Sequence, residues 1–372
     1  MGICGSNAGS PATAFTGRHL SIAHMQSRLY QIDQLRGIAA CGIMIFHFVS
    51  FRFGELPADS FLGRIGIYGV SLFYVISGIA LGHVYGEAQQ SNWFPYRSFF
   101  VKRYFRLMPL FILATVMTIL LSKKAFPASE IILNVTGLFA LFDYDGGIAT
   151  GAWSIGNEWV FYLMLPTLLA IWSHPNNMWR RILIALTILC VVFFAFTPTT
   201  SLTAYWNTYI HPLNQCVFFI AGSAFGYFHW HQRPIDWKTP LLGAAALVCF
   251  IFYPIAGDRI GLVTGFNRLI LTSSVLLFAL SWYRMNIRLW SPLEQFLVKL
   301  GDWSYSIYML HPLVWILLVG SLKWLNWQWN EFIVIATACV ICLFASMISY
   351  NWFERPAMQM AQRFIKRKIS NP

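Results

Sequence analysis

The sequence consists largely of apolar stretches that are each about as long as a membrane-crossing helix. A helix of roughly 20 residues crosses the hydrocarbon core of a bilayer. We count ten such stretches, near residues 33–53, 64–86, 99–121, 152–173, 179–197, 211–230, 239–256, 266–283, 303–322 and 331–353. They are continuous rather than alternating, which argues against a transmembrane β-barrel. The sequence therefore predicts an all-α integral membrane protein, a bundle of about ten transmembrane helices. The apolar stretch 130–142 is shorter, and we expect it to lie at the membrane interface or to re-enter the membrane.

The composition leaves little room for a soluble domain. Hydrophobic residues make up 57% of the 372 residues and charged residues 11%, against the ~25% charged residues of soluble domains. This composition excludes a soluble enzyme and a disordered chain. We predict one membrane domain over residues 31–356. Residues 1–30 contain no span and are expected to form a disordered tail, with Met25 as an alternative start, and residues 357–372 a basic cytoplasmic tail.

The basic residues predict how the chain is oriented in the membrane. The net charge is +12, and the Lys and Arg residues form short clusters between the apolar stretches. With ten alternating spans, 19 of the 26 basic residues fall on the side of the two termini. Cytoplasmic loops carry such an excess. We therefore expect both termini in the cytoplasm, the protein in a bacterial inner membrane, and no nucleic-acid partner.

Ionisable side chains within the apolar stretches are rare, and each is a functional candidate because burying charge in lipid is costly. Arg36 and His47 lie eleven residues apart in the first span, so they share a helix face about 16 Å apart. Arg36 is expected at the cytoplasmic mouth and His47 near the middle of the membrane. A neutral histidine there could exchange protons, or it could be a core side chain that is hydrogen-bonded to a neighbour.

Two arginines mark the cytoplasmic start of the third span. Arg103 and Arg106 are three residues apart and share a helix face. Paired guanidinium groups can bind phosphates bidentately. The alternative is that they only anchor the helix at the interface.

The fourth span combines a hydroxyl, a carboxylate and a phenol on one face. Ser154, Glu158 and Tyr162 follow one another at intervals of four residues. Glu158 is the only carboxylate well embedded in an apolar stretch, so it must pair with a cation or become protonated. We expect Glu158 to take part in the site, for example by pairing with an arginine.

Polar side chains in two other spans are candidates for a supporting role. Ser304, Tyr308 and His311 share one face of the ninth span. His311 precedes a proline and could instead bond to a backbone carbonyl that the proline leaves free. In the second span, polar side chains could line a cavity: Tyr74, Ser77 and His83. Three further histidines lie near span ends and are expected to be interfacial: His211, His229 and His231.

Taken together in their order, these motifs resemble those of the bacterial membrane-bound type 3 acyltransferases, which include polysaccharide O-acetyltransferases. The matching segments, from about Tyr30 to Pro356, are Arg36 with ten residues before His47, Phe73-Tyr-Val-Ile-Ser-Gly78, Arg103-Tyr-Phe-Arg106, Trp153-Ser154 with Glu158, Ser304-Tyr305-Ser-Ile-Tyr308-Met-Leu-His311 and Asn351-Trp-Phe-Glu354-Arg-Pro356. The resemblance implies a bundle of about ten spans, in agreement with the charge distribution. It also implies transfer of an acyl group, usually acetyl, from cytoplasmic acyl-CoA to a hydroxyl of a cell-surface or exported polysaccharide or its lipid-linked precursor.

The resemblance also implies residue roles. His47 is the expected catalytic residue, with Arg36 and Glu158 as its companions. The expected donor-binding residues are Arg103, Arg106, Ser77, Trp153 and Ser154. The expected supporting residues are Tyr74, Tyr162, Ser304, Tyr305, Tyr308 and His311. His47 could act as a general base or carry the acyl group covalently.

The expected partners are the lipid bilayer, acyl-CoA as donor, a glycan or glycolipid acceptor, and other polysaccharide-biosynthesis proteins; no metal is expected. The rival interpretation is a transporter or flippase for a lipid-linked or small polar solute. The sequence shows neither an internal pseudo-repeat nor a pair of interrupted spans at matching positions, which argues against it. The acceptor and the acyl chain cannot be read from the sequence.

Overall fold

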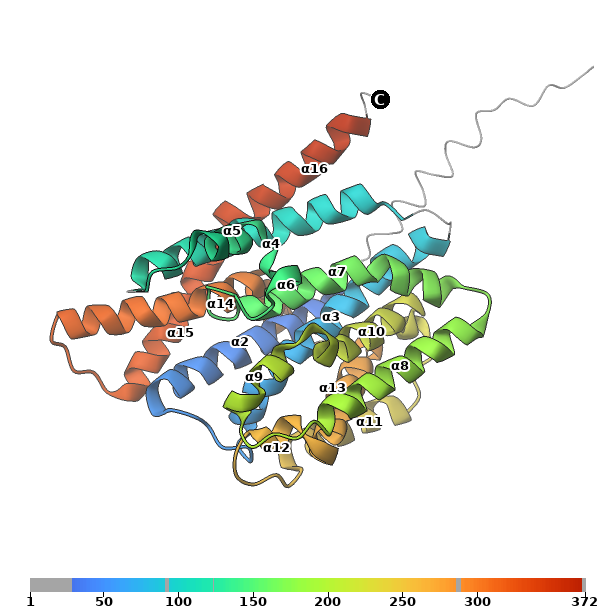
Figure 1. Ribbon diagram of the computed structural model, residues 1–372, viewed down its shortest axis with the longest axis horizontal. Helices are drawn as coiled ribbons and strands as arrows, with labels where there is room; N and C mark the ends of the chain where they lie inside the picture. The colour runs from blue at the N-terminus through green and yellow to red at the C-terminus, as the bar shows by residue number, and fades with distance from the viewer. Residues whose placement is uncertain (1–28, 91–93, 123, 286–288, 370–372) are drawn as a thin grey trace, which may run out of the picture.

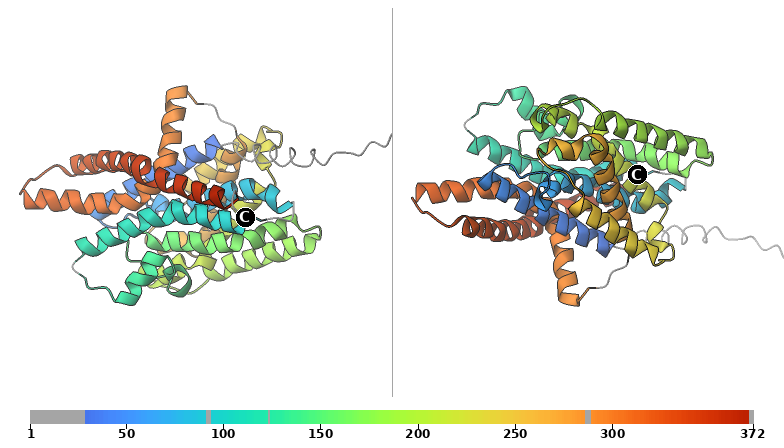
Figure 2. Two further views of the ribbon diagram at one scale, coloured as in Figure 1. Left: turned by 90° about the horizontal axis from the view of Figure 1, so that it is seen from above. Right: turned by 90° about the horizontal axis from the view of Figure 1, so that it is seen from below.

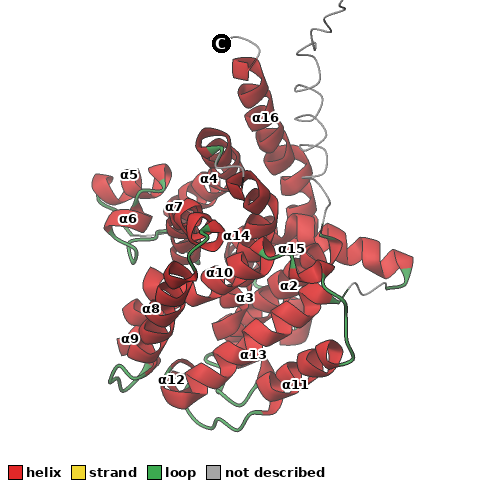
Figure 3. Ribbon diagram, turned by 90° about the vertical axis from the view of Figure 1, so that its right-hand side faces the viewer, coloured by secondary structure: helices red, strands yellow, loops and turns green. Residues whose placement is uncertain are grey.

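The structure is a computed structural model that describes residues 29–369 except 91–93, 123 and 286–288. Every regular element in this part of the chain is a helix, as Figure 3 shows. The all-α prediction is therefore confirmed. Residues 1–28 of the predicted disordered tail lie outside the described residues, and the described chain is helical from Tyr30 onward.

In the part of the chain that the structure describes, eight helices are long and apolar enough to cross a membrane, so the chain is a multi-pass membrane protein. They are α2 (Tyr30–Phe53), α3 (Phe61–Gln90), α4 (Tyr96–Leu121), α7 (Ala152–Ser173), α8 (Asn177–Ala195), α13 (Gly265–Arg284), α14 (Ser291–Trp324) and α15 (Glu331–Ser349). The last of these continues through a π-helical turn, η2 (Tyr350–Glu354), into α16 (Arg355–Ile369). The predicted basic tail is thus helical as far as Ile369, and α16 projects from the bundle in Figure 1.

Two of the ten predicted spans form shorter helices. They are α10 (Pro212–Tyr227), with 16 residues, and α11 (Lys238–Phe252), with 15 residues. The helix α10 begins at Pro212, close to the predicted start, but ends at Tyr227, and the 3₁₀ turn η1 (Trp230–Gln232) follows. A count of ten crossings is therefore not confirmed and stays a prediction. Hydropathy alone extended these two spans too far because apolar side chains directly follow each helix, at Phe228 and Trp230 after α10 and at Ile255 and Ala256 after α11.

The short apolar stretch predicted to lie at the interface forms two small helices. They are α5 (Ala128–Thr136) and α6 (Phe139–Phe142), which pack on α4 and α7 respectively. Two more short helices, α9 (Leu202–Ile210) and α12 (Ile260–Val263), complete the fold. None of these four is long enough to cross a bilayer.

The long helices run side by side around a central pair. Figure 3 shows α3 and α10 in the middle, with α2, α7, α8, α13 and α14 around them. In Figure 2, α14 and α15 lie at one edge and α7 and α8 at the other. The outer helix α8 exposes large apolar side chains such as Leu189 and Phe193, as a lipid-facing helix does.

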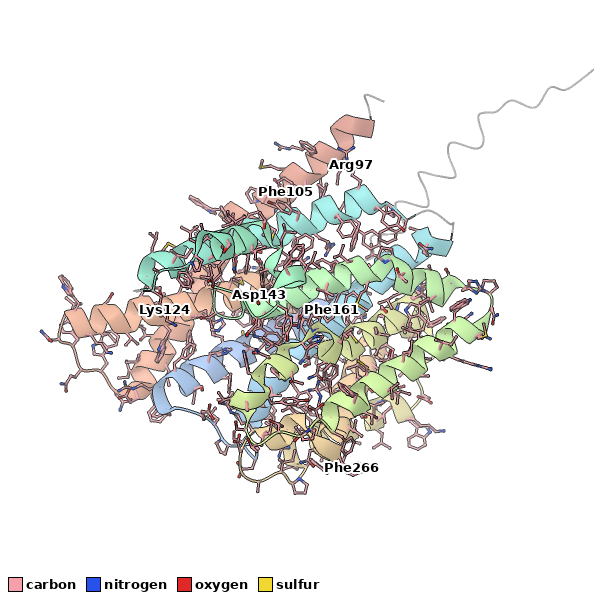
Figure 4. All side chains as sticks on the ribbon, viewed as in Figure 1. Arg97, Phe105, Lys124, Asp143, Phe161 and Phe266 are labelled. Atoms are coloured by element: carbon pink, nitrogen blue, oxygen red, sulfur yellow. The ribbon has the colours of Figure 1, made fainter. Side chains whose placement is uncertain are left out.

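We call the end of the bundle where α2 begins and α3 ends the terminus end. In Figure 4, Arg97 lies there at the start of α4, and Lys124 lies beyond the other end of that helix. This is the end of the bundle at which the sequence predicts most of the basic residues. Its cytoplasmic location stays a prediction.

Glycines let α3 and α10 approach until their backbones touch. Gly78 and Gly82 on α3 face Gly222 and Gly226 on α10, each pair spaced by four residues. A Cβ atom on Gly78 would lie 2.8 Å from the backbone nitrogen of Ser223. Small residues at this spacing allow close helix packing in membranes, where no hydrophobic force draws helices together. The α3–α10 pair is therefore fixed by backbone contact.

A similar contact joins α2 and α14, which run in the same direction. A Cβ atom on Gly37 would lie 2.8 Å from the backbone nitrogen of Gly301. Ten residues further along each helix, His47 and His311 also meet. The alignment of α2 with α14 that brings Gly37 next to Gly301 therefore also brings His47 next to His311.

A buried arginine holds the opposite end of the bundle. Arg64 of α3 donates hydrogen bonds to the carbonyl oxygens of Ala58 (3.1 Å), Phe250 (2.7 Å) and Tyr253 (2.6 Å). The last two carbonyls lie at the end of α11, where helical carbonyls lack partners of their own. Arg64 therefore has a structural role, although it is as deeply buried as a functional arginine would be.

The replacement Gly226→Ala tests the α3–α10 contact. The new Cβ atom would lie 2.7 Å from the backbone nitrogen of His83, and backbone cannot yield as a side chain can. We expect a loss of about 1–3 kcal/mol, the usual cost of overpacking. Thermal unfolding in detergent measures it. Gly320→Ala on α14 is the control, since nothing lies within 4 Å of its Cβ position; equal behaviour of the two variants would contradict the contact.

Candidate active site

A cavity of about 400 Å³ lies among α2, α3, α4, α7 and α14. It brings together eleven of the fourteen side chains predicted for the site, namely Arg36, Tyr74, Ser77, Arg103, Arg106, Ser154, Glu158, Tyr162, Ser304, Tyr305 and Tyr308. His83, which the sequence suggested could line a cavity, lines it as well, and so do Asp33 and Lys102, to which the sequence assigned no role in the site. His47, His311 and Trp153 are not among the lining residues.

The cavity wall carries more positive than negative charge. Its cationic side chains are Arg36, Lys102, Arg103 and Arg106, and its anionic side chains are Asp33 and Glu158. Asp33 accepts a hydrogen bond from Arg36 Nη1 at 3.3 Å. The guanidinium of Arg103 lies 5.8 Å from the ring centre of Tyr162 and 6.0 Å from that of Phe99, at cation–π distance. The surplus of cations suits an anionic ligand.

Glu158 is held by hydroxyl groups from two helices. Ser77 Oγ of α3 donates to Glu158 Oε1 at 2.7 Å, and the Tyr162 hydroxyl, one turn along α7, donates to the same oxygen. No ion pair within the described residues includes Glu158, although Arg36 and Arg103 lie within electrostatic range of it. The spacing of four residues thus brings Tyr162 next to Glu158, as the sequence predicted. The hydrogen bonds of Glu158 take the place of the expected arginine pair.

A second hydroxyl pair closes the cavity toward the opposite end of the bundle. Ser154 Oγ lies 2.8 Å from the Tyr308 hydroxyl, which donates to the Gly151 carbonyl at 3.2 Å. Gly151 has φ 81°, and a Cβ atom on it would lie 2.6 Å from the Tyr308 oxygen. Tyr74 donates to the Ser154 carbonyl at 3.3 Å. Gly151 therefore makes room for the Tyr308–Ser154 contact.

Two other predicted supporting residues bond to backbone. Tyr305 donates to the Leu107 carbonyl on α4 at 2.6 Å, which ties α14 to the helix that carries the arginines. Ser304 donates to the Gly301 carbonyl of its own helix at 2.8 Å. Both lining side chains thus have a structural bond as well.

His47 lies beyond Tyr308, in contact with His311. The Tyr308 and His311 ring centres are 5.9 Å apart, and the His311 and His47 rings stack at 4.8 Å. His47 is half-buried, whereas His311 is fully buried. The predicted catalytic histidine is thus separated from the cavity by Tyr308 and His311, and Arg36 and His47 lie at opposite ends of the predicted site.

Backbone carbonyls fix which nitrogen of each histidine carries the proton. His47 Nδ1 lies 3.1 Å from the Ile43 carbonyl oxygen, and His311 Nδ1 lies 3.1 Å from the Ile307 carbonyl oxygen. A carbonyl only accepts, so in the neutral rings both Nδ1 atoms must be protonated. The one proton on His47 Nδ1 is then shared between the Ile43 carbonyl oxygen and His311 Nε2, which also lies 3.1 Å from it. His47 Nε2 is left with a free lone pair, which is the atom that a base or nucleophile needs.

The predicted donor-binding residue Trp153 faces away from the cavity. Its ring centre lies 5.6 Å from that of Tyr209 and 6.0 Å from that of Trp206 on α9. Neighbouring helical residues point about 100° apart, so Ser154 can face the cavity while Trp153 faces α9. Direct donor contact by Trp153 stays an untested expectation.

One buried contact was missed by sequence reasoning as a part of the site. Glu354, in the π-helical turn, accepts a hydrogen bond from Ser306 of α14 and lies within electrostatic range of Arg106. Both residues stand in motifs quoted above, but only their long-range pairing shows the contact. In the structure, the π turn draws attention to Glu354, since such turns are frequent at functional sites.

The fold is a bundle of helices long and apolar enough to span a membrane, with a cationic cavity among them, and the comparisons with known proteins give its class. The acyltransferase domain of the acyltransferase 3 family matches residues 29–351. The chain belongs to this family, whose members transfer acyl groups. The predicted family resemblance is therefore confirmed.

Two curated relatives align with nearly the whole chain. "Nodulation protein 10" of Rhizobium leguminosarum bv. viciae is 25% identical over 391 residues, which cover 93% of this chain and 98% of the relative. "Acyltransferase MdmB" of Streptomyces mycarofaciens is 23% identical over 377 residues, which cover 90% and 93%. "Protein 2 in picA locus" of Rhizobium radiobacter is 37% identical over 87 residues, 23% of this chain and 42% of the relative. No solved structure matches the chain.

The replacement Tyr162→Phe tests the bond that holds Glu158. It removes one of the two hydroxyl donors to a carboxylate in a membrane-spanning helix, and we expect a loss of about 1–3 kcal/mol. Thermal unfolding in detergent measures the effect. The control is Ser173→Ala at the exposed end of α7, whose hydroxyl donates only to the Ala170 carbonyl; a Tyr162→Phe protein as stable as this control would show that the bond contributes nothing.

Proposed function

We propose that the protein transfers an acyl group, in the first instance acetyl, from cytoplasmic acyl-CoA to a hydroxyl of a cell-surface or exported polysaccharide or its lipid-linked precursor. The observation that carries the proposal is the pairing of a cationic cavity with a histidine whose Nε2 is free, on opposite sides of Tyr308. In this proposal the terminus end faces the cytoplasm of a bacterial inner membrane, as the distribution of basic residues predicts.

The donor enters the cavity from the terminus end. Its phosphate groups pair with Arg36, Lys102, Arg103 and Arg106, which outnumber the carboxylates of the wall. Arg103 is oriented by the rings of Phe99 and Tyr162 rather than by a carboxylate. Its guanidinium therefore keeps hydrogen-bond donors for a phosphate.

The thioester end points past Tyr308 toward His47. Tyr308 and Phe73 both line the cavity, with ring centres 6.3 Å apart. Opening this aromatic pair connects the cavity with the histidines. The hydroxyl acceptor reaches His47 from the opposite end of the bundle, toward which its half-buried ring lies.

The transfer needs one base at the acceptor hydroxyl. His47 Nε2 takes the hydroxyl proton while the hydroxyl oxygen forms a bond to the thioester carbonyl carbon. The carbon–sulfur bond then breaks, the proton passes to the leaving thiolate, and the products are the ester and free CoA. His311 is a positioning residue: its Nε2 accepts from His47 Nδ1 and stabilises the positive charge that His47 gains.

The replacement His47→Ala removes the proposed base. We expect acceptor-dependent release of CoA from acetyl-CoA to fall by about 10²–10⁴-fold, the usual contribution of general-base catalysis. Purified protein with and without a membrane glycan extract is the test, and His174→Ala, in the connection between α7 and α8, is the control. If the His47→Ala protein is folded and as active as this control, the assignment is wrong; if even the wild type releases no CoA, the transport interpretation gains weight.

The replacement Arg106→Gln tests the phosphate contact. Loss of one charge-assisted hydrogen bond, worth about 1.5–3 kcal/mol, should raise the KM for acetyl-CoA by about 10-fold or more with a smaller change in kcat. Arg181→Gln on the exposed side of α8 is the matched control. An unchanged KM in the Arg106→Gln protein would place the phosphates elsewhere.

A further inference from the structure

Three histidines from separate segments meet next to the cavity. His83 belongs to α3 and lines the cavity, while His229 and His231 flank the start of η1, just after α10. The potential ligand nitrogens of the three rings all lie within 4.8 Å of one another. The proposed acyl transfer uses none of them.

The spacing of the rings matches a metal centre. His83 Nδ1 and His229 Nδ1 are 3.1 Å apart. Two nitrogens bound to one tetrahedral zinc at ~2.0–2.1 Å are separated by about 3.3 Å. The first pair therefore already has the required spacing, and the third ring needs a shift on the order of 1 Å.

A buried tyrosine holds the third ring in a suitable orientation. His231 Nδ1 lies 2.7 Å from the hydroxyl oxygen of Tyr283, a fully buried side chain of α13. When His231 Nδ1–H donates to this oxygen, Nε2 carries the free lone pair. Metal-binding histidines are commonly fixed through their second nitrogen in this way.

The backbone around the cluster is constrained as well. His229 has φ 47°, in the left-handed region that residues other than glycine rarely adopt. Gly226 brings α10 so close that a Cβ atom there would meet the backbone of His83. The α3–α10 contact thus fixes the distance between His83 and the two histidines after α10.

The neighbouring cations are directed elsewhere. Arg284 donates to the Pro234 carbonyl at 3.0 Å, and the Arg233 guanidinium lies 5.3 Å from the ring centre of Trp230. Both guanidinium groups thus contact these partners rather than the histidine rings of the cluster. The three rings are therefore available to a cation.

We propose that His83, His229 and His231 bind one divalent transition-metal ion of the zinc type, with water as a fourth ligand. Imidazole nitrogens suit Zn²⁺, Co²⁺ and Ni²⁺, whereas Mg²⁺ and Ca²⁺ prefer oxygen ligands. The ion joins α3 to the connection between α10 and α11 at the terminus end of the cavity. It lies apart from the His47–His311 pair and takes no part in the proton transfer, so the proposal does not depend on the proposed function.

The direct test is metal binding by the full chain. The protein carries an affinity tag without histidine and is freed of metal with a chelator before titration. We expect one Co²⁺ per chain with the visible absorption of a tetrahedral site, displacement of Co²⁺ by Zn²⁺, and no competition by Mg²⁺. Binding of less than one tenth of an equivalent of Co²⁺ per chain would overturn the proposal. A spectrum of octahedral Co²⁺ alone would overturn it as well, and neither result needs a variant protein.

Variants identify the ligands. His229→Ala and the milder His231→Gln should each weaken binding at least about 10-fold, while His174→Ala should bind like the wild type. Zn²⁺ at a hundredfold excess over its Kd should raise the Tm of the wild type and His174→Ala by about 3 °C or more, and leave the two ligand variants unchanged. If the ligand variants bind Co²⁺ like the wild type, the ion lies elsewhere and the assignment is wrong.

Discussion

Backbone contact between α3 and α10 is the constraint on which the other features of the bundle depend. In a membrane, lipid tails are as apolar as leucine, so helices associate through close packing rather than through the hydrophobic effect. The glycines at 78, 82, 222 and 226 supply that packing. From the fixed α3, Tyr74 and Ser77 reach the cavity, and His83 reaches both the cavity and the turn after α10. A shift of α3 would therefore disturb the cavity and the histidine cluster together.

The same side-chain type serves two purposes in this membrane protein, and its surroundings distinguish them. Arg64 has three backbone carbonyls as acceptors, so its charge is fully used within the protein. Arg36 and Arg103 border the cavity instead. Arg36 has one weak contact with the carboxylate of Asp33. Arg103 lies near two aromatic rings. Burying cations without matching anions is costly. In the proposed function a donor that brings phosphate charge offsets this cost, which is why we place the site at the cavity rather than at Arg64.

The sequence predicted which residues share a face of one helix, and it missed contacts between residues of different helices. Spacing by four placed Glu158 and Tyr162 on one face, and rarity of charge identified Arg36 and Arg106. The family resemblance placed Trp153 with Ser154 in the site, although a helix turns adjacent residues to different faces. The histidine cluster and the Ser306–Glu354 bond lie between segments far apart in sequence. Only the packing of the helices against one another reveals such pairs.

The His47–His311 pair shows how a reactive tautomer can be set without a carboxylate. Each Nδ1 is bonded to the carbonyl four residues earlier in its own helix, so the tautomer follows from local geometry. The distance between the rings follows from the parallel packing of α2 on α14, which Gly37 and Gly301 fix ten residues earlier on both helices. In the proposed mechanism His47 is neutral before the proton transfer, and burial favours the neutral form over the charged one. A carboxylate partner would instead favour the charged imidazolium, whose nitrogens have no lone pair for the proposed proton transfer.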